Sequence, residues 1–547
     1  MKVRADILRT YQSLHTWTGI TAGLLLFIGF YAGSLTMFKH ELQQWITPAF
    51  KPINQAQQEQ TKVADWQLLL NKTRTLYGNE MAAGFELDLQ QPEAVIRWYS
   101  QGSARDLHMD NKLVQVWQGQ DGQLQKTENY ENQFADLIDY LHRSAGIAGE
   151  IGHDQAGVYV LGIAAVLYFL ALVSGVVVLL PTLVKTFFAL RKDKGASRFW
   201  LDSHNLVGVA SLPFHFIIAW TVIGFAFHDL IYDGISVFYG DKPLFQAPAR
   251  SSQTFHIQSL PPLEQHIAAA KAYSPEHQPV KLSFMRLNSP APALTVQMIS
   301  TNGMMRGPEA DYLFMQPYTL KIQPFTFSNK DGASYSNFVM GLFSLHFGTY
   351  AGDFGRWGYF VMGLLGAFLF YSGNLLWLNK RMKKSAGADR NCQLMAALTI
   401  GVCLGSVLAV VLTLFIGKLL GSVLTNVNYA YLWCYYLSFV LFVAYSFWRG
   451  AAIAAYHGLL FLSLACALLP VTTGYILWQL PDWYTASASF GVDLMASLFA
   501  GVFLLAARKT KKRMLQPTDG GVWSIQASAP LRSTPSTTER SNPDSAP

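Results

Sequence analysis

The chain has 547 residues, of which 51% are hydrophobic and only 14% are charged, and its mean hydropathy is positive. This composition excludes an ordinary soluble enzyme and favours a protein of the lipid bilayer. The net charge of +7 does not indicate nucleic-acid binding, because the basic residues form short clusters beside alternate hydrophobic blocks and not one stripe.

Eight hydrophobic blocks follow one another along the chain, and each is long enough to cross a membrane as a helix of about 20 residues. The blocks are 14–38, 158–183, 206–227, 357–378, 394–420, 429–447, 451–477 and 490–507. The sequence therefore predicts an integral membrane all-α bundle with about eight transmembrane helices. The first block has no convincing small-residue cleavage site, so we expect an uncleaved helix and not a signal peptide.

Lysine and arginine mark the cytoplasmic loops. They cluster before the first block, between the second and third, after the fourth, between the sixth and seventh, and after the eighth. By the positive-inside rule these five segments face the cytoplasm, as both termini then do. The two long polar segments between the blocks consequently lie outside, and we expect each to fold as a small soluble domain.

These observations divide the chain into eight predicted parts. The parts are a first span at 1–38, an outer insertion at 39–156, a second span at 157–183, a third span at 204–228, a second outer insertion at 229–355, a fourth span at 356–379, a C-terminal four-helix membrane region at 394–507 and a tail at 515–547. The tail is rich in Ser, Thr and Pro, and we expect it to be disordered and cytoplasmic.

The first four spans contain an internal repeat that duplicates histidines. His15 opens the first span and His204 opens the third, each four residues before a glycine. His142 precedes the second span and His346 precedes the fourth, both on the outer side. Because both copies run in the same direction, their pseudo-twofold axis stands along the membrane normal, and equivalent histidines should face each other across it.

Paired imidazoles on diverging helices are the arrangement that a six-coordinate haem needs. His15 with His204 would form a site near the cytoplasmic surface, and His142 with His346 a site near the outer surface. His15 and His40 lie about 37 Å apart along one helix, so they cannot share a haem. The sequence has no C-x-x-C-H motif and its four cysteines lie in or beside the C-terminal helices, so two non-covalent b-type haems are predicted and no disulfide framework.

Other histidines are alternative ligands. His215 lies about three turns inside the third span, where an unpaired imidazole is poorly accommodated. His40, His228 and His153 lie at the outer boundary, where they could replace a member of the outer pair or line a substrate site. A single histidine at a helix end is otherwise most often an interfacial residue.

Four segments give the chain a family resemblance: LHTWTG in the first span, LIDYLHRSAG before the second, DSHNLVGV in the third, and SLHFGTYAGDFGRWGYFVMGLLGAFLFYSG leading to NKR in the fourth. Over residues 1–385 the chain resembles the PepSY-associated transmembrane-helix family of iron-regulated bacterial inner-membrane proteins. The resemblance implies a di-haem b-type reductase acting at the periplasmic face, some relatives of which reduce ferric siderophores. It implies haem ligation by His15, His142, His204 and His346.

The same resemblance implies that the insertions are PepSY-like, each a helix with a small antiparallel sheet. Residues 95–98 and 113–117, with a turn at 120–123, are compatible with a hairpin. Residues 263–272 would form the matching helix of the second insertion.

The leading functional hypothesis is a one-electron relay across the inner membrane. A membrane quinol or a cytoplasmic donor would supply electrons, and a ferric siderophore or another ferric chelate, held in a cavity between the outer domains, would accept them. No G-x-G-x-x-G follows a predicted strand, so neither a flavin nor an NAD site is expected.

Two other classes of function stay open. The first is a membrane-anchored PepSY-type binding or regulatory module without redox activity. The second is a transporter, although the spans lack a midplane carboxylate pair and Asp493 is the only acidic residue clearly within one.

Overall fold

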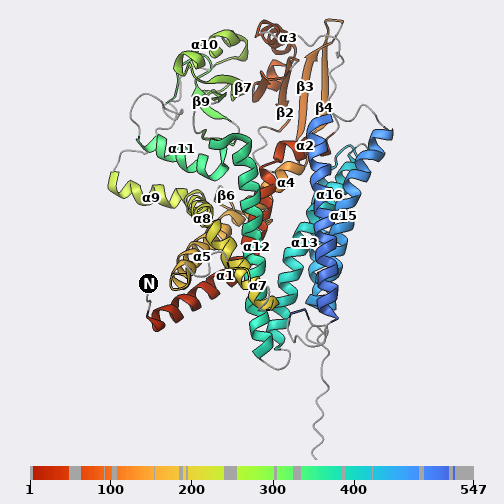
Figure 1. Ribbon diagram of the computed structural model, residues 1–547. Coiled ribbons are helices and arrows are strands. Elements are labelled where there is room, and N and C mark those ends of the chain that lie inside the picture. Colours follow the sequence, from red (N-terminus) through yellow and green to blue (C-terminus); the bar gives the residue numbers. More distant parts are fainter. Residues whose placement is uncertain are drawn as a thin grey trace, which may run out of the picture.

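The computed structural model describes most of the chain as a bundle of long helices capped at one end by a β-sheet (Figure 1). The described residues are 4–47, 63–91, 93–101, 107–119, 121–152, 154–183, 189–191, 195–239, 255–300, 305–308, 310–323, 334–384, 389–421, 423–479, 486–515 and 522–523. Helix α1 begins and α16 ends at the end of the bundle away from the sheet.

Seven helices are long and apolar enough to cross a membrane, and a bent pair raises the number to eight. The seven are α1 (Ala5–Thr36), α5 (Ala156–Leu179), α12 (Gly352–Lys384), α13 (Arg390–Leu420), α14 (Asn428–Arg449), α15 (Ala451–Gln479) and α16 (Ala486–Met514). The bent pair is α7 (Ala196–Ala210) and α8 (Leu212–Ala226). The prediction of a multi-pass helical membrane protein with about eight spans is confirmed.

The third span is broken and not straight. Its two halves meet at Ser211 and are inclined by 66°. Pro213 stands in the first turn of α8, where its missing N–H is tolerated but where it cannot continue the hydrogen bonds of α7. The Ser211 hydroxyl donates to the carbonyl of Val207 and so occupies one of the last acceptors of α7. The local sequence Ser-Leu-Pro therefore explains the break.

The strands of both insertions form one antiparallel sheet, in the order β4-β3-β2-β1-β7-β8-β9. The first insertion contributes β1 (Gly84–Asp88), β2 (Val95–Tyr99), β3 (Lys112–Gln118) and β4 (Leu124–Tyr130). The second contributes β7 (Gln278–Met285), β8 (Ala293–Ile299) and β9 (Asp311–Met315). Strands β1 and β7 join the two halves, with Glu86 opposite Ser283. One continuous sheet thus replaces the gap expected between two outer domains.

A helix precedes the strands of each half. These helices are α3 (Val63–Met81) and α10 (Leu263–Tyr273), and both bury apolar residues in a single core with the sheet. The predicted helix at 263–272 is confirmed, and so is the antiparallel pairing of 95–98 with 113–117. The described residues of the turn predicted at 120–123 join β3 to β4. Strand β4 itself was not predicted, because its residues are mostly polar and only partly buried.

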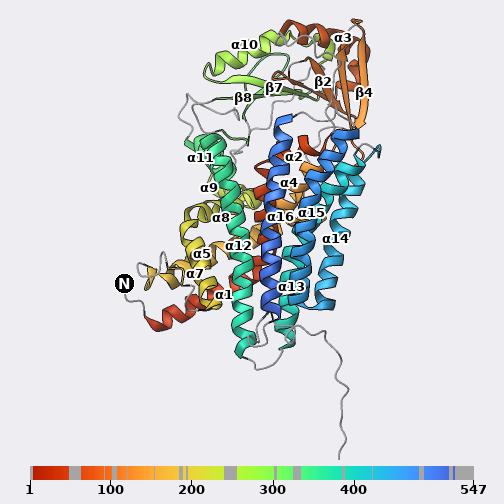
Figure 2. The ribbon, with the colours of Figure 1, turned by 45° about the vertical axis from the view of Figure 1, so that its right-hand side comes forward.

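Short elements connect the sheet to the membrane helices (Figure 2). They are α2 (Lys39–Ile46), α4 (Phe134–Ser144), the two-residue strands β5 (Glu150–Ile151) and β6 (Asp154–Gln155), α9 (His228–Tyr239), α11 (Ser334–Phe347) and the single turns Ile257–Ser259 and Thr349–Ala351. Helices α4 and α11 carry His142 and His346. The connection between sheet and bundle therefore lies beside the predicted outer site.

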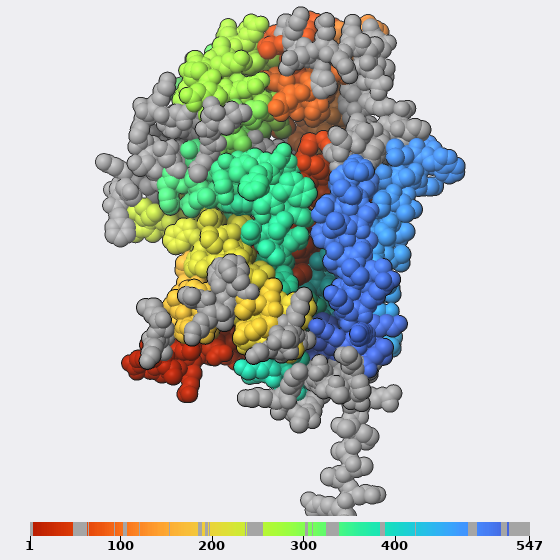
Figure 3. All heavy atoms as spheres, in the orientation of Figure 1, coloured from red at the N-terminus to blue at the C-terminus, as the bar shows by residue number. Residues whose placement is uncertain are grey.

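The C-terminal helices α13 to α16 form a block beside the N-terminal spans (Figure 3). Trp45 of α2 fixes part of this contact, because its indole N–H donates to Asp493 of α16 at 3.0 Å and its ring lies 3.8 Å from Nζ of Lys418. Thr473 also donates to Asp493. Most of the predicted tail lies outside the described residues, but Val522 is fully buried against this block.

A carboxyl group just before α4 provides a pH test of the outer region. Burial, and then the nearby carboxylate of Asp136, raise the pKa of Glu131 to about 7. The carboxyl group of Glu131 loses its proton near pH 4.5 in the unfolded chain and near pH 7 in the folded chain. Its full contribution to stability is therefore present only below about pH 4.5 and is lost as the pH rises to about 7. Stability should fall by about 2 kcal/mol as the pH rises from about 4.5 to 7.

Thermal unfolding of the detergent-solubilised protein between pH 5 and 8 measures this effect. Glu131→Gln should flatten the pH dependence across that interval, since glutamine does not titrate. An unchanged slope in the variant would show that Glu131 does not carry the effect.

Candidate metal centres

The structure brings His15 of α1 and His204 of α7 together near the end of the bundle away from the sheet, where the two imidazoles interact electrostatically. Each ring lies against a glycine of the next span. A Cβ at Gly175 would lie 3.0 Å from Cε1 of His15, and one at Gly373 would lie 3.3 Å from Cε1 of His204. The two glycines follow a serine at equivalent places in the repeat, so the repeat positions both rings in the same way.

Hydrogen bonds fix the tautomer of both inner imidazoles. Nδ1 of His15 is 2.8 Å from the carbonyl oxygen of Ala171, which can only accept, so this nitrogen carries the proton. Nδ1 of His204 is 2.9 Å from the Ser372 hydroxyl, which itself donates to Leu369 and therefore accepts from the ring. In the neutral ring, Nε2 then holds the lone pair that a metal requires.

The outer pair has ring-to-ring geometry that suits a shared metal. The centroids of the His142 and His346 rings are 6.1 Å apart, and the ring planes differ by 35°. Two imidazoles bound through Nε2 to one ion place their centroids about 6 Å apart, because each metal–nitrogen bond is about 2 Å. The centroid distance of the pair predicted from the repeat is thus compatible with two imidazoles that share one metal ion.

The outer imidazoles also donate through Nδ1. That of His142 lies 2.9 Å from the carbonyl oxygen of Gly29 in α1. That of His346 lies 2.9 Å from the Thr221 hydroxyl, whose own proton is directed at the carbonyl of Ile217. All four paired histidines therefore carry the proton on Nδ1, and no hydrogen bond to their Nε2 atoms occurs in the described part of the chain.

This arrangement is the one that proteins use for histidine ligands: the outer-shell acceptor orients the ring and leaves Nε2 for the metal. The two centres are separated along α1, since His15 and Gly33, which contacts His142, lie 18 residues apart. At 1.5 Å per residue this is about 27 Å, close to the thickness of the hydrocarbon core. The two histidine pairs thus lie near opposite ends of α1.

His215 is buried among aromatic rings between the two pairs. Its ring contacts Phe30 and Tyr168 with centroids 5.6 and 6.0 Å away, and its Cε1 would lie 3.0 Å from a Cβ at Gly366. Neither ring nitrogen has a hydrogen-bond partner among the described residues. Gly366 lies seven residues from Gly373, so His215 is about 10 Å along α12 from the inner pair. The structure places no second imidazole opposite it within the described residues.

The remaining alternatives belong to neither pair. His40 is exposed on α2 and its Nε2 contacts Gln44 of the same helix. His228 begins α9 and lies with the carboxylates of Asp154 and Asp229. His153 falls outside the described residues.

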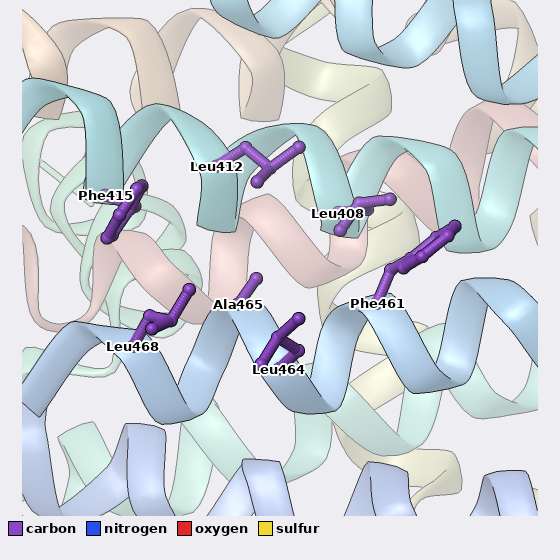
Figure 4. Close-up of a pocket in the computed structure, with 7 residues that line it drawn as sticks. All are labelled: Leu408, Leu412, Phe415, Phe461, Leu464, Ala465 and Leu468. Atoms are coloured by element: carbon purple, nitrogen blue, oxygen red, sulfur yellow. The ribbon is translucent and has the colours of Figure 1, made fainter. Parts of the chain in front are cut away.

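An apolar cavity of about 270 Å³ lies elsewhere, between α13 and α15. Figure 4 shows its lining, which consists of Leu408, Leu412, Phe415, Phe461, Leu464, Ala465 and Leu468. With no titratable side chain in its wall, this cavity suits an acyl chain and not a redox centre.

Both histidine pairs lie within the part of the chain that matches a known family. A family model described as "PepSY-associated TM region" matches residues 12–380. The match contains all four paired histidines and every strand of the sheet, and it ends before α13. No curated protein matches the chain.

Gly33 provides a test of the outer centre that leaves the histidines in place. A Cβ there would lie 2.6 Å from Nδ1 of His142, so Gly33→Ala should push the ring away from Gly29 and remove the outer centre. Gly19→Ala is the matched control, because a Cβ at Gly19 meets nothing within 4 Å. The absorbance of bound cofactor per chain should fall by about half in the first variant only. Equal cofactor content in both variants would contradict the assignment of His142.

Proposed function

The chain belongs to the family of PepSY-associated TM regions, and from that premise we propose that it is a membrane electron-transfer protein holding two b-type haems, one on each histidine pair. The observation that carries the proposal is the shared hydrogen bonding of the four imidazoles, in which each Nδ1 donates to a neighbouring helix and each Nε2 keeps the lone pair that a metal requires.

When bound, haem supplies a one-electron redox couple, which no side chain of the protein provides at ordinary potentials. The protein's own residues ligate, orient and bury the group. Gly175 and Gly373 leave room for the inner rings, and Gly33 leaves room for an outer one. Between the two sites Phe30 packs against Tyr168 and Phe370 at centroid distances of 5.7 and 5.3 Å, which excludes water from the middle of the bundle.

Two centres suit a protein that moves electrons across a membrane, because one pair lies near each end of α1. We propose that the membrane is the bacterial inner membrane, with the termini in the cytoplasm and the sheet in the periplasm. The basic residues at the ends of α12 and α16 agree with this orientation. The donor would be a membrane quinol or a cytoplasmic reductant at the inner pair.

The two halves of the sheet support a PepSY-like origin of the insertions. Each half has a helix followed by antiparallel strands, and the halves meet at β1 and β7. Because these strands pair over five residue positions, the two halves of the sheet leave no gap at this seam. We propose that a ferric chelate of the siderophore class is reduced on the sheet side of the membrane near His142 and His346.

Single replacements of the paired histidines test the haem assignment. Difference spectra, reduced minus oxidised, should show low-spin b-type haem at about two per chain in the unchanged protein. Replacing any one of the four histidines by alanine should remove one haem and leave the other, because the pairs are about 27 Å apart. His40→Gln should retain both, since His40 is exposed and lies outside the pairs.

The same spectra distinguish the proposed haem protein from a binding module without redox activity. A purified protein with no Soret band would leave a membrane-anchored binding module. Loss of both haems in every single variant would contradict two independent sites.

A reduction assay tests the acceptor side. Vesicles containing the protein and a reduced quinone should convert an external ferric chelate to Fe(II), measured with a colorimetric Fe(II) chelator. His346→Ala should lower the initial rate at least tenfold, since it removes an outer ligand, while His40→Gln should not. Iron entering vesicles without any reductant would indicate a transporter and contradict the proposal.

A further inference from the structure

A second group of metal-type ligands lies near the outer histidine pair. Asp154 of β6 and the first two residues of α9, His228 and Asp229, each offer a ligand atom, and these three atoms all lie within 4.8 Å of one another. The cluster combines one imidazole with two carboxylates, contributed by both halves of the internal repeat. None of these residues belongs to the four haem-ligand candidates.

Hydrogen bonds position two of the three ligands. Asp154 pairs with Ile151 in the short hairpin of β5 and β6, and the N–H of Ala156 donates to the carbonyl of Gly149 to close that hairpin at the start of α5. His228 lies two residues after the end of α8, and its Nδ1 donates to the carbonyl of Phe225 at 2.8 Å. These bonds orient the His228 ring and hold the hairpin that carries Asp154.

The hydrogen bond to Phe225 determines which atom of His228 faces the carboxylates. A carbonyl only accepts, so Nδ1 carries the proton and the neutral ring presents a lone pair at Nε2. That atom is 3.2 Å from Oδ1 of Asp229. At this distance a protonated ring forms an ion pair with Asp229, and a metal ion bound by both groups would take the place of that proton. The Nδ1 contact is the one that metal-ligating histidines make.

The site is accessible to ions. The side chains of His228 and Asp229 are 40% and 39% exposed. One imidazole nitrogen with carboxylate oxygens suits a first-row cation such as Fe(II) or Mn(II) better than Cu(I), which prefers sulfur.

We propose that Asp154, His228 and Asp229 bind Fe(II) as it leaves the site of reduction. The choice of iron rests on the proposed function, whereas the ligand geometry does not. Phe225, which accepts the hydrogen bond from His228, also contacts the His346 ring at a centroid distance of 5.0 Å. Phe225 thus links the cluster directly to His346 of the outer pair. The cluster takes no part in electron transfer and receives the ion after its charge has fallen.

Binding to the purified full-length protein tests the proposal directly. Anaerobic equilibrium dialysis with Fe(II), and titration with Mn(II) followed by the loss of its free electron paramagnetic resonance signal, both measure the site without any reductase assay. The unchanged protein should bind one ion that Asp154→Asn combined with Asp229→Asn weakens at least tenfold. Asp353→Asn is the matched control, because Asp353 is a carboxylate at the start of α12, 86% exposed and outside the cluster.

The outcomes separate this site from the haem assignment. The double variant should keep both haems and an unchanged reduced-minus-oxidised spectrum. A purified protein that lacks haem but still binds Fe(II) would overturn only the proposed function. Equal binding in the double variant and in the unchanged protein would overturn the Fe(II) site. Displacement of Mn(II) by equimolar Mg²⁺ would also overturn it, because an unselective acidic surface behaves in that way.

Discussion

The arrangement of this protein depends on the donation of Nδ1–H from four imidazoles to acceptors on neighbouring helices. Carbonyls of Ala171 and Gly29 accept from His15 and His142, and hydroxyls of Ser372 and Thr221 accept from His204 and His346. Each bond ties a ring to a second helix while leaving Nε2 for a metal. These four hydrogen bonds thus make the orientation of each imidazole depend on how the helices pack.

Helix α1 carries the largest share of this arrangement. It provides His15 at one end and, near the other, the carbonyl of Gly29 and the space beside Gly33 that hold His142. It packs along α5 and α12, so both histidine pairs lie against one continuous element. The third span, its counterpart in the repeat, is broken at Ser211, and this break lets α8 present Thr221 to His346. The two halves are therefore similar in ligands but not in shape.

The repeat made the pairing of histidines predictable, because equivalent residues of parallel copies meet across the pseudo-twofold axis. Hydrophobic blocks likewise predicted the spans, since burial in lipid requires about 20 apolar residues whatever the contacts. The single sheet was not predictable, because β1 and β7 are separated by about 190 residues and their pairing has no local signal. Nor does the sequence predict that Asp154 and His228 lie together, because only the folded chain brings them close. The acceptors of the four Nδ1 protons likewise have no signal in the sequence.

The central claim is that each pair ligates one iron through two histidine nitrogens. Electron paramagnetic resonance of the oxidised protein at low temperature, combined with electron–nuclear double resonance after labelling histidine with ¹⁵N, measures this directly. The account predicts two low-spin ferric signals, each coupled to two histidine nitrogens. A high-spin signal, or a low-spin signal coupled to a single histidine nitrogen, would contradict it.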